Sequence, residues 1–236
     1  MHRLDKVLGR HALAVKIGAA LGFELLIFAG VLFYGAGTDD WTGGWFFLGL
    51  VTISIFPAAY ALLRHDPKLI EARLSLAPRG QPLSDRIFVP FHSAMILLWA
   101  ASAGYDAVRH GWSHVPFDLR AAAALCLPLC VWMGYMTMRQ NPFLATTVCL
   151  QTDRGHRVVD NGAYAIVRHP FYTVTIACQL SASLLLGSWL SVALTLIIAA
   201  MLALRLVHEE RFLEENLAGY ASYKARTVWR LVPGLW

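Results

Sequence analysis

Six stretches of the sequence are almost continuously apolar, and polar segments separate them. They cover residues 15–34, 45–63, 88–107, 119–138, 171–186 and 190–207. Because the hydrocarbon core of a bilayer is about 30 Å thick, a helix of roughly 20 apolar residues can cross it. The pattern therefore predicts an all-α, polytopic transmembrane bundle of about six spans. Only three residues separate the last two spans, which predicts a tight helical hairpin, and residues 211–223 are expected to form a short amphipathic helix on the lipid surface.

The composition supports the membrane assignment. Hydrophobic residues make up 57% of the chain and charged residues 15%, whereas soluble domains average about 45–50% and about 25%. This balance excludes a soluble globule of this size. Residues 1–236 are expected to form a single integral membrane domain.

Positive charges fall on one side of the predicted topology. Of the 20 Lys and Arg residues, all but Arg109 and Arg120 lie in or beside the polar segments that share a side with the two chain ends. Since Lys and Arg concentrate on the cytoplasmic side of membrane proteins, we expect a multi-pass protein with both termini in the cytoplasm. The net charge of +5 is then topological, and it indicates anionic membrane lipids, rather than nucleic acid, as partners.

Two polar clusters flank the predicted hairpin. Arg168 and His169 precede the fifth span, and His208, Glu209 and Glu210 follow the sixth. Because the intervening turn is so short, both clusters should emerge at the same face of the membrane. We therefore expect them to lie close together, although some forty residues of sequence lie between them.

The fifth span carries a polar stripe. Tyr172, Thr175, Gln179 and Ser183 recur at spacings of three and four residues, so they share one face of a helix. Such a stripe either packs against other helices or lines a wet cavity, and the clusters at its open end favour a cavity. Pro170 suits the first turn of this helix and disfavours a helical conformation for His169.

These residues resemble a known family. The segment "GAYAIVRHPFY" at 162–172, the hairpin, and then "RLVHEERFLEENLAGYASYKARTVWRLVPGLW" at 205–236 look like the isoprenylcysteine carboxyl methyltransferase family, which also resembles membrane phospholipid N-methyltransferases. The resemblance covers about 139–236, and the first four spans carry no signature. Two positions differ from the usual family pattern: Ala163 stands where proline is common, and Thr173-Val174 where a glycine is common.

The resemblance implies S-adenosylmethionine as cofactor, held near the cytoplasmic face by a methyltransferase core at 139–236. The part at 1–138 would then face lipid and substrate. Carried over position by position, the cofactor-binding residues would be Gly162, Tyr164, His169, Pro170, Tyr172, Glu209 and Glu210. Arg205 and Arg168 would be the catalytic residues, orienting the acceptor as cations. The expected acceptor is the carboxylate of an isoprenylcysteine-like, lipophilic molecule that enters from the bilayer.

The chemistry leaves alternatives open. A carboxylate is already ionised at neutral pH and needs no general base, whereas a small thiol or a lipid amine would need proton removal, for which His169 or His208 is a candidate. A non-catalytic scaffold or a transporter is the alternative outside the enzymes. No metal site is expected, because the four cysteines show no metal-ligand spacing. Glu24 lies in the middle of the first span, and its role stays open between a polar contact and a structural pair.

Overall fold

The computed structural model describes residues 2–74, 83–147 and 149–236, and within them all regular structure is helical. The membrane-length helices are α1 (His2–Ala36), α2 (Thr42–His65), α4 (Leu83–Gly104), α5 (Phe117–Gln140) and α7 (Trp189–Asn216). The shorter elements are α3 (Pro67–Leu74), the π-helix η1 (Tyr105–His110), the 3-10 turns η2 (Thr152–Arg154) and η3 (Gly162–Ala165), α6 (Pro170–Leu186) and α8 (Tyr220–Arg226). The prediction of an all-α polytopic bundle is confirmed.

Five helices of the described chain are long and apolar enough to cross a membrane, and α6 is an apolar helix of 17 residues. Each of the six predicted spans thus coincides with a helix. The prediction for 211–223 is wrong in its boundaries, because α7 continues without a break to Asn216. The chain turns at Gly219, whose φ of 85° is left-handed, and the short helix α8 follows at Tyr220–Arg226.

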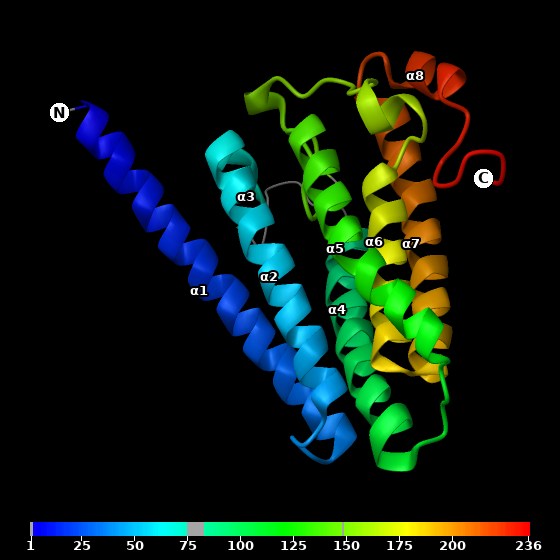
Figure 1. Ribbon diagram of the computed structural model, residues 1–236. Helices are drawn as coiled ribbons and strands as arrows, with labels where there is room; N and C mark the ends of the chain where they lie inside the picture. The colour runs from blue at the N-terminus through cyan, green and yellow to red at the C-terminus, as the bar shows by residue number, and fades with distance from the viewer. Residues whose placement is uncertain (1, 75–82, 148) are drawn as a thin grey trace.

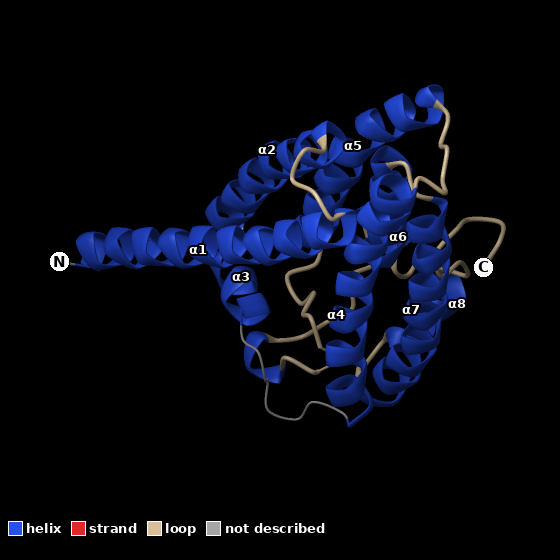
Figure 2. Ribbon diagram, turned by 90° about the horizontal axis from the view of Figure 1, so that it is seen from below, coloured by secondary structure: helices blue, strands red, loops and turns tan. Residues whose placement is uncertain are grey.

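The helices form a bundle in which α4, α5, α6 and α7 pack together, while α1 leans outward toward its N-terminal end (Figure 1). Helix α6 packs against α5 and α7, and α4 packs against α1 and α7. The view from below shows α1 extending well beyond the other helices (Figure 2). Leu32, Leu127, Leu186 and Ile198 are almost completely buried in the core that these helices share.

The buried carboxylate of Asp106 fixes the turn of the α6–α7 hairpin. Gly187 ends α6 with a φ of 84°, and Ser188 caps α7 by accepting from Ser191 N at 3.0 Å. Asp106 Oδ2 accepts from Ser188 Oγ at 2.6 Å and from Leu190 N at 3.0 Å. Because the turn is locked, the other ends of α6 and α7 are held side by side.

Candidate active site

The segment before α6 depends on a glycine. Gly162 begins η3 with a φ of 58°, and a Cβ at this position would lie 2.6 Å from Gln140 Oε1. That same oxygen accepts from Ala163 N at 2.9 Å. The tight turn turns Tyr164 inward, where it is 5% exposed, and Tyr223 Oη donates to the Tyr164 carbonyl at 2.7 Å. Gly162 therefore acts by shaping the backbone that carries Tyr164.

The following residues pair with the C-terminal tail. Arg168 N donates to Trp229 O at 2.9 Å and His169 N to Arg230 O at 3.0 Å. His169 then occupies the N-cap of α6 with a non-helical backbone, and Pro170 is the first helical residue, as predicted. Thr173, one of the positions that differ from the usual family pattern, donates its hydroxyl to Leu231 O at 2.8 Å. The tail is thus tied to the start of α6 by three hydrogen bonds.

Glu210 is the centre of a buried charged junction. Its carboxylate accepts from Arg168 Nε at 2.6 Å and from Arg230 Nε at 2.9 Å, and it lies 3.2 Å from His169 Nε2. Arg168 also donates from Nη1 to the carbonyls of Thr227 and Val228, at 2.7 and 2.8 Å. The junction joins α7, the start of α6 and the tail through one carboxylate.

Glu209 faces the other way and belongs to a second network. Tyr172 Oη donates to Glu209 Oε2 at 2.7 Å and accepts from Arg205 Nη1 at 3.1 Å. Arg205 also pairs with both carboxylate oxygens of Asp85, each at 2.9 Å, and donates to Thr146 O at 2.8 Å. The prediction that the two polar clusters meet across the hairpin is therefore confirmed by Tyr172–Glu209 and His169–Glu210 contacts.

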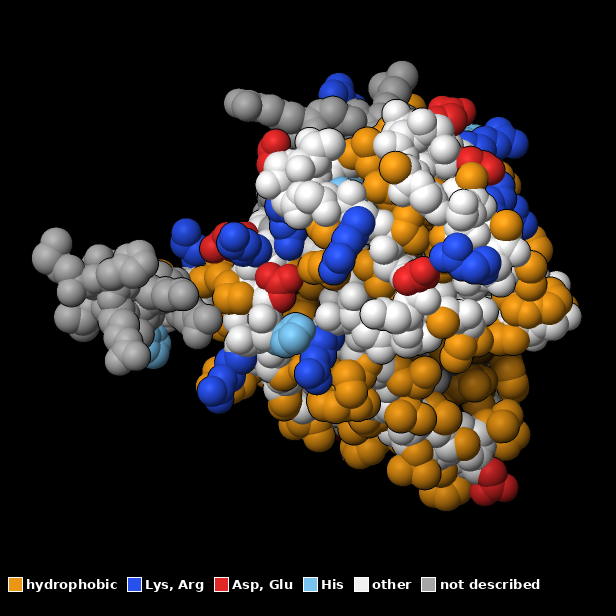
Figure 3. Space-filling view, turned by 90° about the horizontal axis from the view of Figure 1, so that it is seen from above, with side chains coloured by type: hydrophobic (Ala, Val, Ile, Leu, Met, Phe, Trp, Pro, Cys, Tyr) orange, Lys and Arg blue, Asp and Glu red, His pale blue; other side chains and the backbone are white. Residues whose placement is uncertain are grey.

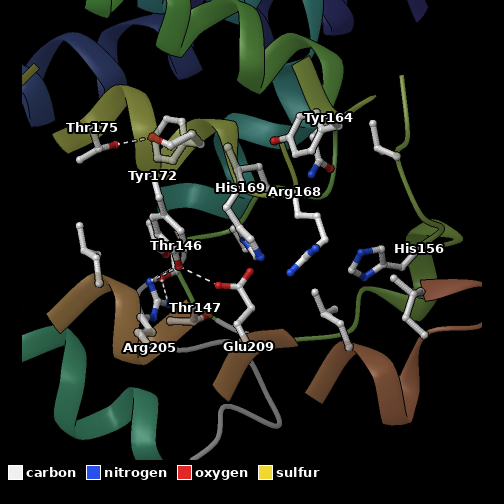
Figure 4. A pocket seen from close by; sticks show the side chains of 18 of the residues that line it. Thr146, Thr147, His156, Tyr164, Arg168, His169, Tyr172, Thr175, Arg205 and Glu209 are labelled. Carbon is white, nitrogen blue, oxygen red and sulfur yellow. Dashed lines mark hydrogen bonds between the residues drawn. The ribbon is translucent and has the colours of Figure 1, made fainter. Parts of the chain in front are cut away.

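A cavity of about 340 Å³ lies at this end of the bundle. Six of the predicted site residues line it, namely Tyr164, Arg168, His169, Tyr172, Arg205 and Glu209, and Figure 4 shows them around it. Gly162, Pro170 and Glu210 do not line it. These three residues instead position the residues that line the cavity. The sequence pattern does not distinguish this supporting role from direct ligand contact.

Several buried polar atoms of the cavity lining have no hydrogen-bond partner among the described residues. They are the hydroxyls of Thr147, Tyr164 and Tyr220 and Nε2 of His92. Such atoms are rare in folded proteins because leaving them unpaired costs free energy. Burial raises the pKa values of Tyr164 and Tyr220, so both hydroxyls stay protonated and can donate. The lining is therefore suited to a ligand rich in polar groups.

A comparison with family models agrees with this geometry. Residues 124–215 match the model of the isoprenylcysteine carboxyl methyltransferase (ICMT) family. Over this region, the chain is similar to the ICMT family. With five helices long and apolar enough to cross a membrane among its described residues, the chain is an integral multi-pass membrane protein. A comparison with curated proteins gives no match.

A second hollow opens between α4 and α7, beside the cavity. This lateral groove has a volume of about 520 Å³ and is bordered by Ile87, Phe91, Met201 and Leu204 among others. Ile87 and Leu204 are 65% and 68% exposed, on helices that are long enough to span a bilayer. Phe88, Arg205 and Glu209 line both the groove and the cavity, so these three residues form the boundary between them.

The end of the molecule that carries the cavity bears many charged side chains. Seen from above, Lys, Arg, Asp and Glu side chains are spread over this face, and hydrophobic side chains gather along its edge (Figure 3). A charged face bounded by apolar flanks is the expected surface of a membrane protein at the water interface.

Some residues of the site were not predicted. Arg73 and His92 line the cavity from α3 and α4, outside the matched region, and Thr147 and His156 line it from the loop after α5. Asp85, near the start of α4, lines the groove and pairs with Arg205. Nothing in the local sequence marks Arg73, Asp85, Thr147 or His156, because each is an ordinary polar residue in a polar segment, and His92 is a single histidine in the predicted span 88–107. Their positions at the cavity and the groove depend on tertiary packing, which the local sequence does not reveal.

Proposed function

We propose that this protein transfers the methyl group of S-adenosylmethionine to the carboxylate of a lipophilic, isoprenylcysteine-like acceptor. One observation carries the proposal: a cavity lined by unpartnered polar atoms shares the residues Phe88, Arg205 and Glu209 with an apolar groove between two membrane helices. A polar donor and an apolar acceptor need this combination of surfaces, and the residues between them lie where the two molecules would meet.

The cavity fits the donor. The Glu209 carboxylate can accept strong hydrogen bonds from ribose hydroxyls or from an ammonium group. The hydroxyls of Tyr164, Tyr220 and Thr147 can satisfy ring nitrogens and other polar atoms. S-adenosylmethionine supplies a methyl group that is already activated on a sulfonium. The protein then has to bind, orient and exclude water, and such positioning is worth effective molarities of about 10⁵–10⁸ M.

Arg205 is placed to orient the acceptor. A guanidinium carries five N–H donors, and Asp85, Thr146 and Tyr172 take four of those of Arg205. One donor on Nη1 remains at the boundary between cavity and groove, where an acceptor carboxylate would arrive from the membrane. Because a carboxylate is ionised at neutral pH, no base is required, which agrees with the engagement of His169 Nε2 by Glu210.

One observation favours a second candidate, methylation of a thiol or an amine. His92 lines the cavity, stacks on Phe88 at 5.5 Å between ring centroids, and leaves Nε2 without a partner among the described residues. A thiol or ammonium acceptor must lose a proton before it attacks, and His92 is a group in the lining that could take it.

The orientation in the membrane follows from the charges. We place the cavity, both termini and the junction at the cytoplasmic face, since nearly all Lys and Arg residues belong to this side. Anionic lipids are the expected partners of this face. In this arrangement residues 139–236 supply most of the donor site and the α7 side of the groove, and residues 1–138 supply the α4 side of the groove.

The test uses the full-length protein in lipid nanodiscs with S-adenosylmethionine carrying a labelled methyl group. Three probes share one farnesyl thioether tail and end in a carboxylate, an alcohol or an amine, and a farnesyl thiol is the fourth. Label transferred to the carboxylate, at a rate that is flat between about pH 6 and 9, supports the proposal. Transfer to the thiol or amine with a rate that rises with pH supports the second candidate. A protein that binds no donor and transfers no label is the scaffold or transporter, and the proposal fails.

A further inference from the structure

Helix α3 directs one basic side chain into the cavity. Asp66 precedes the helix and accepts from Leu69 N at 3.1 Å, and Pro67 is its first residue, a favourable start. Leu69 and Ile70 are buried against α2 and α5. Arg73 follows them by four and three residues, so it lies on the same buried face, and it lines the cavity.

Arg73 makes few interactions for a half-buried cation. Nη1 donates to Leu144 O at 3.3 Å, and the guanidinium lies 5.3 Å from the ring centroid of Phe171. No carboxylate pairs with it among the described residues. By contrast, Arg168 and Arg205 each pair with a carboxylate and use four of their five donors.

The energetics of such a group favour an anionic ligand. A desolvated charge is unfavourable unless it is paired and hydrogen-bonded. Burial lowers the pKa of Arg73, and only the Tyr164 hydroxyl opposes this effect. Arg157 also lines the cavity and has no carboxylate partner among the described residues, but it is exposed and water can solvate it. Arg73 is therefore the lining cation whose electrostatic requirement is least met by the protein itself.

The position of Arg73 decides which anion it receives. The residues that associate with it, Phe171 and Tyr164, line the cavity alone, whereas the acceptor groove meets the cavity at Phe88, Arg205 and Glu209. Figure 4 shows Tyr164 and Arg205 on opposite sides of the cavity. An acceptor that stops at Arg205 does not extend to Arg73, but a donor that fills the cavity does.

We propose that Arg73 binds the carboxylate of the amino-acid part of the methyl donor, so that α3, outside the matched family region, completes the donor site. This inference rests on the proposed use of S-adenosylmethionine. It assigns opposite ends of the donor to different parts of the chain, with the carboxylate at α3 and the reactive methyl directed toward Arg205 and Glu209.

The experiment is calorimetric binding of S-adenosylmethionine and of decarboxylated S-adenosylmethionine to the full-length protein in detergent, with no acceptor present. The wild type is expected to prefer the intact donor by about 10- to 100-fold, as for one charge-assisted hydrogen-bonded pair. Arg73→Gln should remove this preference and leave the affinity for the decarboxylated donor within about twofold. Arg73→Lys should restore part of it. Arg64→Gln is the matched control, because Arg64 is exposed and lies 5.9 Å from the Tyr60 ring, outside the cavity.

Each other outcome has a definite meaning. Equal binding of both donors by the wild type, or an equal loss for both in Arg73→Gln, overturns the assignment and leaves the methyltransferase function intact. Unchanged donor binding in Arg73→Gln with a raised KM for the acceptor moves Arg73 to the acceptor and also overturns it. Absence of donor binding by the wild type instead refutes the proposed function itself.

Discussion

Replacing Glu210 by glutamine is expected to destabilise the junction between the hairpin and the tail. Glutamine keeps the shape of the side chain but removes its charge, and its amide N–H groups would face the donors of Arg168 and Arg230. The side chains of Arg168 and Glu210 are only 4% and 3% exposed, and removing one partner of a buried ion pair costs about 3–5 kcal/mol. Arg230 is 28% exposed and adds little. At roughly 2–4 °C per kcal/mol for a chain of this size, Tm should fall by about 6–20 °C.

The measurement is thermal unfolding of the donor-free protein in detergent, followed by tryptophan fluorescence. Glu214→Gln is the control on the same helix, because Glu214 pairs with Lys224 at the surface, where 40% and 34% of the two side chains are exposed, and such pairs contribute about 0–1 kcal/mol. If Glu210→Gln melts like Glu214→Gln, the junction does not stabilise the fold. If it keeps its Tm and loses donor affinity, Glu210 contacts the donor directly, and the structural role described above is refuted.

Three further outcomes are expected. Glu209→Gln should weaken S-adenosylmethionine binding by about 10- to 100-fold in calorimetry while its Tm stays close to that of Glu214→Gln; an unchanged Kd contradicts the donor site. Asp85→Asn leaves the buried Arg205 charge without its carboxylate and should lower the free energy of unfolding by about 3–5 kcal/mol, which an unaltered thermal melt would refute. Burial, and to a smaller extent Arg154, lower the pKa of His156. The contribution of His156 to stability is therefore complete above the unfolded-state pKa of about 6.5 and is lost as the pH falls through the folded-state pKa. His156→Gln should flatten the dependence of Tm on pH in this window, and equal slopes for the variant and the wild type would contradict the prediction.

The spans and the hairpin could be predicted because their signals are local. The length of an apolar run shows directly whether it can cross a bilayer. The three-residue turn at Gly187 is short enough to bring the two ends of the hairpin to the same side. The contacts of Glu209 with Tyr172 and of Glu210 with His169 follow from that turn. The end of α7 differs from the prediction because the change from apolar to charged residues does not end the helix: no glycine or proline interrupts it before Asn216.

The contributions of α3 and α4 could not be predicted for a different reason. Arg73 and Asp85 lie in or beside a polar connection between two spans, and their neighbours in sequence give no sign of burial. Arg73 reaches the cavity because Leu69 and Ile70 pack against other helices, and Asp85 reaches the groove because α4 packs against α7. Both are long-range information. Likewise, the sequence pattern ranks Glu209 and Glu210 equally, and only the direction in which each side chain leaves α7 separates a wall residue from a lining residue.

The pairing of the tail with the start of α6 has a consequence for the order in which the molecule assembles. Arg168 bonds to carbonyls that lie 59 and 60 residues further along the chain, beyond both helices of the hairpin. A nascent polypeptide therefore inserts every membrane helix before the C-terminal tail can pair with the start of α6, and the proposed methyl transfer requires this pairing. Removing the tail after α8, or holding it away from α6 in a rigid fusion, should yield a protein that inserts normally into the bilayer but has no activity.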